Sequence, residues 1–233
     1  MSPGRFLRQV WLLFSKDVRV ELRAGELIYA TMLFAAIIVL LFSFAFLGGS
    51  PPTVEVMAGV LWVALALAGL VGISRSFERE READTLRGLL LSPLSRSAIY
   101  LSKLLSMALL MSLVVVVVVP GLLLLFGMQL SGLDALGRLL LLLFLGILGY
   151  TAVASLFSAS VGRARERELQ ETLLVYPLSV AVLLAGARGT YDILYGTTES
   201  LIDAARWVRF LLAFDVLSIT CGLWLFEPLS TNE

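Results

Sequence analysis

The sequence predicts an all-α integral membrane protein with six transmembrane helices, an N-terminal interfacial amphipathic helix and a cytoplasmic coupling helix. Of its 233 residues 59% are hydrophobic and 15% are charged, and the mean hydropathy is +0.93. Soluble domains carry about 25% charged residues. The apolar residues also fall in long runs separated by short charged segments, which is typical of membrane spans. We therefore treat residues 1–233 as a single transmembrane domain.

Residues 3–24 predict the interfacial helix. Its apolar face gathers Phe6, Leu7, Val10, Trp11, Phe14, Val18 and Leu22, and its basic residues cluster on the other side. This pattern favours a helix that lies in the membrane interface. Asp17 and Glu21 fall within the apolar arc, and a protein neighbour explains them better than lipid does. A plain membrane anchor and a partner-binding helix both remain open.

Six apolar segments then predict spans. They cover residues 27–47, 54–73, 101–126, 136–161, 172–187 and 207–226. A span needs about 20 residues, with a lower limit of about 17, so the fifth segment is marginal. The third contains the valine run 114–119, which favours β-structure in water. In lipid every backbone group must bond internally, so a helix is expected there.

The distribution of lysine and arginine predicts the orientation. With six spans, fourteen of these residues lie on the side of the N-terminus and four on the other side. Cytoplasmic loops carry the excess of positive charge, so both termini are expected in the cytoplasm. If the fifth segment did not cross, the division would be seventeen against one. Charge alone therefore slightly favours five spans, and both counts stay open.

The stretch "SFEREREADTLRGLLLSP", residues 76–93, predicts the coupling helix. Acids and bases alternate at three-residue spacing and form a ladder of i,i+3 pairs, followed by leucines. Pro93 ends the helix, and Ser95 is a candidate N-cap for the third span. The candidate docking residues are Phe77, Glu78, Glu80, Arg81, Asp84, Leu86, Leu89 and Leu90. The alternative is a solvated loop that only satisfies the charge rule, but such a loop needs neither acids nor a leucine cluster.

Three polar residues are intramembrane candidates. Asp215 lies midway along the sixth segment, where a carboxylate costs about 2.5–3.5 kcal/mol on insertion scales and normally faces the bundle. It is either a gate or pairing site, or it makes a structural hydrogen bond to a neighbouring Ser, Thr or Tyr. Tyr176 precedes Pro177, which either kinks the helix or is accommodated without a hinge. Tyr150 opens the small-residue stretch "GYTAVASLFSASVG", which is typical of close helix packing.

The composition argues against chemistry in this chain. It contains no histidine, one cysteine and no G-x-x-x-x-G-K-[ST] sequence, so no metal site, catalytic constellation or phosphate-binding loop is expected. The zero net charge does not suggest a nucleic-acid partner. A role in transport or coupling fits these absences better than a membrane enzyme.

Three stretches together resemble a known family. They are "SFEREREADTLRGLLLSPLSRSAIYLSKLL", "RERELQETLLVYPLSVAVLLAGA" and "WVRFLLAFDVLSITCGLWLFE". In order and spacing they are similar to the CcmB permeases, the haem exporter B proteins of bacterial cytochrome c maturation, within the wider type-2 ABC exporters. The resemblance covers about residues 10 to 228.

The resemblance implies a six-span permease in the bacterial inner membrane. ATP and Mg²⁺ belong to a separate ATPase subunit that docks on the coupling helix, and this chain binds no cofactor itself. Further partners are haem-handling membrane subunits, an extracytoplasmic haem chaperone and a second permease copy. Haem is the candidate substrate, although ATP use could instead release the loaded chaperone. The alternatives are a type-2 exporter permease for a drug, lipid or polysaccharide, and a scaffold unrelated to ABC transporters.

Overall fold

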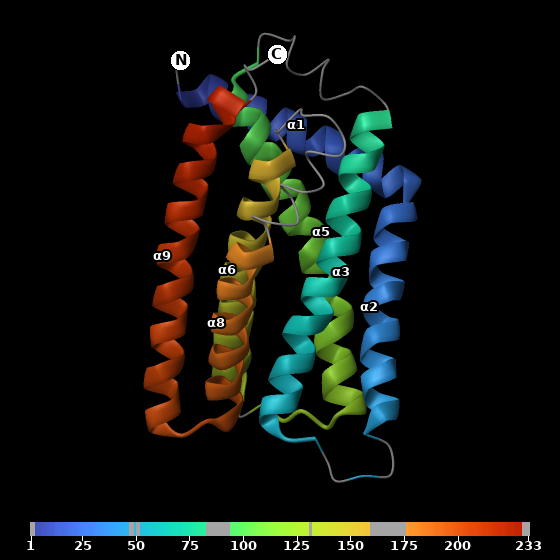
Figure 1. The fold of residues 1–233 in the computed structure, drawn as a ribbon, viewed down its shortest axis with the longest axis vertical. Helices are drawn as coiled ribbons and strands as arrows, with labels where there is room; N and C mark the ends of the chain where they lie inside the picture. Colours follow the sequence, from blue (N-terminus) through green and yellow to red (C-terminus); the bar gives the residue numbers. More distant parts are fainter. Residues whose placement is uncertain are drawn as a thin grey trace.

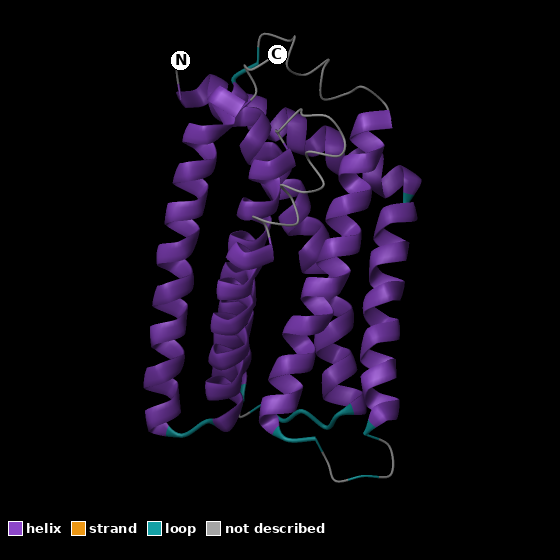
Figure 2. Ribbon diagram, in the orientation of Figure 1, coloured by secondary structure: helices purple, strands orange, loops and turns teal. Residues whose placement is uncertain are grey.

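The computed structural model describes residues 3–46, 49, 52–82, 94–130, 132–158 and 176–229. Within these ranges the regular structure is entirely helical, so the predicted all-α class is confirmed (Figures 1 and 2). The helices are α1 (Pro3–Ala24), α2 (Glu26–Ala45), α3 (Val54–Glu82), α5 (Arg96–Leu125), α6 (Leu133–Ser158), α8 (Tyr176–Tyr195) and α9 (Thr198–Leu229).

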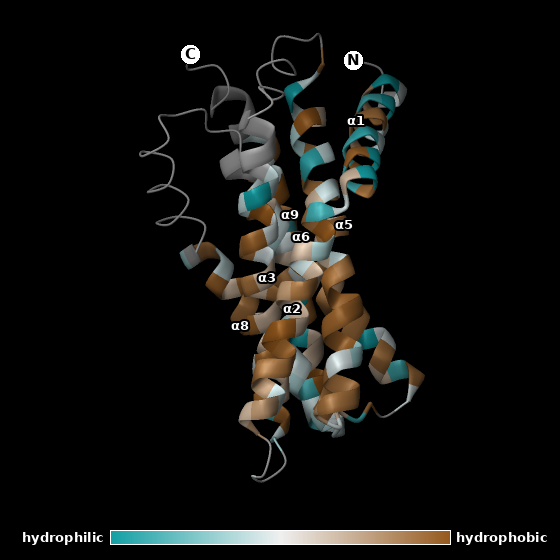
Figure 3. Ribbon diagram, turned by 90° about the vertical axis from the view of Figure 1, so that its right-hand side faces the viewer, coloured by the Kyte–Doolittle hydropathy of each residue, from teal (hydrophilic) through white to brown (hydrophobic). Residues whose placement is uncertain are grey.

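Five of these helices are long and apolar enough to cross a membrane. Among the described residues they are α2, α3, α5, α6 and α9, and Figure 3 shows that hydrophobic residues dominate the middle of the bundle. This supports a multi-pass membrane protein. Helix α8 does not meet the same criterion, and Arg188 and Asp192 interrupt its apolar sequence. Hydropathy therefore does not show that α8 crosses the membrane.

The long helices form one bundle with α1 across an end (Figure 1). Helix α3 contacts α2, α5 and α8, and α6 contacts α5, α8 and α9. Helices α8 and α9 form a hairpin whose short connection contains Gly196 at φ 71°, a conformation that glycine adopts without strain. Helix α1 packs on α5 and α2. Gly25, at φ 66°, provides the turn between α1 and α2.

Trp62 joins three helices at the centre of the bundle. Its indole nitrogen donates a hydrogen bond to Thr190 Oγ1 of α8 at 2.9 Å, and the residue is almost fully buried. The ring lies against Gly146 of α6 and Gly186 of α8, where a Cβ atom would overlap ring atoms. Small residues let membrane helices approach closely, and here the space that they leave is filled by one aromatic ring.

Helix α1 lies along the first half of α5. Gln9 Oε1 accepts a hydrogen bond from Ser95 Oγ at 3.1 Å, and Asp17 forms an ion pair with Lys103. The two contacts are eight residues apart on both helices, so the helices run in the same direction. Leu13 lies between them in a small apolar cluster with residues of α5.

Some local details differ from the sequence-based expectations. Ser95 occupies the N-cap position of α5, but its side chain makes no capping bond and contacts Gln9 instead. Residues 188–206, which lie between the fifth and sixth predicted spans, are helical up to Tyr195 and again from Thr198. Across this hairpin Trp207 Nε1 of α9 donates a hydrogen bond to Asp192 Oδ2 of α8 at 3.0 Å.

Candidate functional site

The predicted docking residues lie at the end of α3 and beyond it. Helix α3 continues without a break from the second span to Glu82, so Phe77, Glu78, Glu80 and Arg81 are part of the same helix as Trp62. This end of α3 lies at the same end of the bundle as α1 (Figure 1). Asp84, Leu86, Leu89 and Leu90 lie outside the described residues. The docking surface therefore stays a prediction.

A buried ion pair lies at the same end of the bundle. Lys103 Nζ is 3.0 Å from Asp17 Oδ2, and Lys16 Nζ is 2.9 Å from Asp17 Oδ1. Lys103 is only 5% exposed, whereas Lys16 is open to the surroundings. A buried ammonium group is costly unless it is paired, so Asp17 is required on the inner face of α1. Lys103 is therefore the protein neighbour that the position of Asp17 in the apolar arc predicted.

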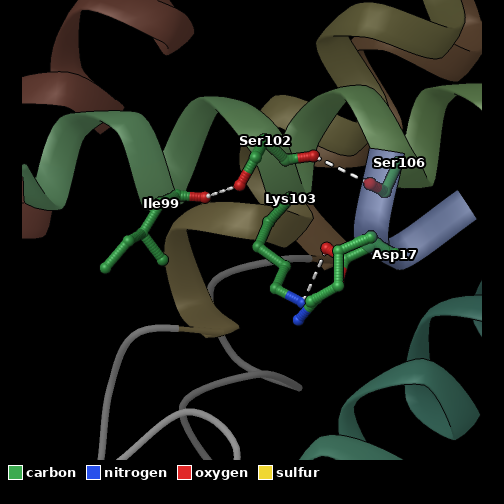
Figure 4. Close-up of polar contacts among 6 residues, drawn as sticks. Asp17, Ile99, Ser102, Lys103 and Ser106 are labelled. Atoms are coloured by element: carbon green, nitrogen blue, oxygen red, sulfur yellow. Dashed lines mark hydrogen bonds and ion pairs between the residues drawn. The ribbon is translucent and has the colours of Figure 1, made fainter. Parts of the chain in front are cut away.

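Two serines complete this part of α5 (Figure 4). Ser102 Oγ donates to the carbonyl oxygen of Ile99 at 2.8 Å, and Ser106 Oγ donates to that of Ser102 at 2.9 Å. Their hydroxyl groups therefore bond to carbonyl oxygens of their own helix. Lys103 was missed as a site residue in the sequence, although a lysine just inside an apolar run is a usable signal for a buried pair.

Asp215 faces the interior of the bundle. It is 3% exposed, and its two carboxylate oxygens accept no hydrogen bond from the described residues. A Cβ atom at Gly149 of α6 would lie 2.6 Å from Asp215 Oδ1, so the carboxylate occupies the space left by that glycine. Ser179 Oγ of α8 is also buried and has no partner within the described part of the chain. The described residues thus provide no structural hydrogen bond for Asp215.

Tyr150 does not join Asp215 in one site. Tyr150 Oη donates a hydrogen bond to the carbonyl oxygen of Ala66 at 3.3 Å, and its ring fills the space beside Gly69. Tyr150 therefore packs α6 on α3, while the preceding Gly149 faces Asp215 on α9. Tyr176 is the first residue of α8, and its side chain lies outside the description.

Tyr100 is a further buried polar residue that the sequence did not reveal. Its hydroxyl group donates to the carbonyl oxygen of Ala152 at 3.2 Å, and it lies where a Cβ atom at Gly222 would be. Tyr100 thereby links α5, α6 and α9. No pattern along the chain separates this tyrosine from the others, because its partners are more than fifty residues away.

The comparison with protein families connects these features to a known class. The family model described as "CcmB protein" matches residues 8–226. The chain belongs to the CcmB family. The match contains residues 76–93, the Asp17–Lys103 pair and Asp215, and it confirms the resemblance found in the sequence.

A curated relative supports the same assignment. The "Heme exporter protein B" of Pseudomonas aeruginosa is 30% identical to the chain over 219 residues. The matched region covers 91% of this chain and 95% of that protein. The two proteins therefore correspond along nearly their whole lengths, not merely in one shared segment.

Proposed function

We propose that this CcmB-family protein is the permease subunit of an ABC transporter that supports haem delivery across the cytoplasmic membrane for cytochrome c maturation. The observation that carries the proposal is the match to heme exporter protein B, which extends over 91% of this chain and 95% of the relative. The all-helical, multi-pass character of the chain fits a permease.

The proposed permease crosses the membrane six times. Helix α8 contacts α3, α6 and α9 and so lies inside the bundle, although its composition is less apolar. Its 20 residues extend about 30 Å at 1.5 Å per residue, which matches the hydrocarbon thickness. Six crossings place both termini on one side, and the excess of lysine and arginine assigns that side to the cytoplasm.

ATP hydrolysis is proposed to take place on a separate subunit. The sequence contains no P-loop, so ATP and Mg²⁺ would be bound by a partner ATPase. Residues 76–93 are the proposed docking element, with Leu86, Leu89 and Leu90 filling a groove of that partner. The uninterrupted helix from Val54 to Glu82 supports this, because a rigid element can carry a displacement from the docking end into the membrane.

The chain is proposed to work with subunits that hold the haem. Haem iron takes His, Cys, Met or Tyr ligands, and this sequence has no histidine and one cysteine. A histidine ligand must therefore come from another membrane subunit or from the extracytoplasmic chaperone. The outer faces of α2 and α9 are apolar and exposed, and they leave room for a second permease copy beside lipid.

The decisive experiment is a haem stain of c-type cytochromes in a bacterial host that lacks this gene. We expect covalent haem to disappear and to return when the gene is supplied on a plasmid. A control plasmid carrying the ATPase gene alone should not restore the stain. Normal cytochromes in the deletion strain would contradict the proposal and favour a type-2 exporter of a drug, lipid or polysaccharide.

A further inference from the structure

A cavity lies between α1, α2, α3 and α5, next to the Asp17–Lys103 pair. Its volume is about 440 Å³, which is in the range of small-molecule sites, about 300–1,000 Å³. Most of its wall is apolar and comes from side chains such as Val18, Leu22, Leu27, Leu109, Leu110 and Leu113. The cavity therefore suits a ligand that is mainly hydrocarbon.

The polar part of the wall carries charges of both signs. Two lysines, Lys16 and Lys103, and two acids, Asp17 and Glu21, line the same cavity. Their formal charges cancel. An anionic head group would be attracted to the two lysines but repelled at short range by the two carboxylates. A head group that contains one negative and one positive centre can match both signs.

The cavity is accessible from the surface that faces lipid. Leu22 and Leu109 line it and are 69% and 39% exposed, respectively. The adjacent α2 presents Tyr29 and Leu33 on its outer side, and both are also exposed. In a membrane this surface is covered by hydrocarbon, so a lipid can enter the cavity with its acyl chains remaining in apolar surroundings.

We propose that this cavity binds one molecule of phosphatidylethanolamine, a zwitterionic phospholipid whose head group carries a primary ammonium. Its phosphate lies near Lys16 and Lys103, its ammonium group lies near Asp17 and Glu21, and its acyl chains pass between α1, α2 and α5. The bound lipid fills the space between the interfacial helix and the bundle, and it holds α1 against α5. The proposal is independent of haem export, because it uses only the wall of the cavity and the membrane environment.

Native mass spectrometry of the full chain, released from nanodiscs with equal amounts of three lipids, tests the proposal. The lipids are phosphatidylethanolamine, phosphatidylcholine and phosphatidylglycerol with identical acyl chains. We expect one phosphatidylethanolamine to be retained after the bulk lipid is removed. The choline head group has no N–H donor for the carboxylates, so its retention should be about tenfold lower.

A matched pair of variants identifies the position of the bound lipid. Ser106 lines the cavity, and Ser106→Phe places a ring in it. Its neighbour Leu105 is exposed and is not part of the wall, so Leu105→Phe makes a comparable change outside the cavity. We expect S106F to lose the retained lipid and L105F to keep it.

Three results would overturn the proposal. The first is equal retention of the three lipids by the wild-type chain, a measurement that does not depend on any variant being folded. The second is retention of phosphatidylethanolamine by a folded S106F variant at the wild-type level. Preferential retention of phosphatidylglycerol would also contradict it and would indicate that the lysines dominate the head-group site.

Discussion

At the scale of single residues, the buried charges show what the bundle tolerates. Lys103 is buried, and its ion pair with Asp17 compensates for the loss of water. Asp215 is buried to a similar degree but receives no hydrogen bond from the described residues. A carboxylate in this situation destabilises the protein, and its presence favours a functional role over a structural one.

This difference makes Asp215→Asn an informative substitution. Because no described hydrogen bond is lost and an ionisable group is removed from the interior, we expect the variant to be at least as stable as the wild type. We also expect it to lower the yield of haem-stained cytochrome c several-fold, as a gate or pairing site requires. Thermal unfolding in detergent and the haem stain measure the two effects. Loss of stability with normal cytochrome levels would instead assign Asp215 a structural hydrogen bond.

At the scale of elements, helix contacts depend on the fit between Trp62 and two glycines. Gly146 and Gly186 leave the space that the indole ring fills, so a side chain at either position would separate α3 from α6 or α8. Interior overpacking costs about 1–3 kcal/mol. One hydrogen bond and one ion pair fix the position of α1, since Gln9 contacts Ser95 just before α5 and Asp17 contacts Lys103 within it.

We therefore expect Gly146→Ala and Gly186→Ala each to lower the free energy of unfolding by about 2 kcal/mol. Gly137→Ala is the matched control, because Gly137 is in α6 as well and a Cβ atom there would meet nothing within 4 Å. The control should be neutral or slightly stabilising, since alanine favours a helix over glycine. Denaturation in mixed micelles measures all three. Equal effects of G137A and G146A would mean that Trp62 can move aside.

The coupling helix yields a prediction about assembly. Leu86→Asp or Leu90→Asp places a charge in the proposed apolar contact, and we expect the co-purified ATPase to fall about tenfold, because a buried unpaired charge is strongly unfavourable. Membrane insertion should be unchanged. Ile202→Asp is the control, because Ile202 is exposed at the opposite end of the bundle. Wild-type recovery of the ATPase with both leucine variants would place the docking surface elsewhere.

At the scale of the whole molecule, the open question is the number of crossings. Six spans place the α8–α9 connection outside and the C-terminus in the cytoplasm, whereas five spans leave the C-terminus outside. The hairpin of α8 and α9 packs as part of the bundle, which favours six.

Two measurements distinguish these topologies. A C-terminal green fluorescent protein should fluoresce, because it folds in the cytoplasm, and a C-terminal alkaline phosphatase should be inactive. In a Cys221→Ser background, Thr197→Cys should react with a membrane-impermeant maleimide added outside the cells. Fluorescence lost together with active phosphatase would establish five spans.

Much of the fold and part of the site follow from the sequence. Long apolar runs are buried in lipid in preference to water. In lipid, a helix lets a single segment satisfy all of its backbone hydrogen bonds internally. The predicted all-helical membrane class is therefore confirmed. The family resemblance is also confirmed. It could be recognised in the sequence because its motifs are contiguous stretches of the chain.

The tertiary structure decided the contacts between residues far apart along the chain. Asp17 by itself indicated a protein neighbour, but Lys103 became that neighbour only because α1 lies along α5. Likewise, nothing along the chain indicated that Asp192 would accept a hydrogen bond from Trp207, or Thr190 one from Trp62, because both contacts depend on how α8 packs on its neighbours. Hydropathy is a property of each residue in its local segment, whereas a buried pair depends on which helix faces which. Local hydropathy therefore establishes that the chain is a helical membrane protein, and helix packing establishes which residues hold its few buried charges.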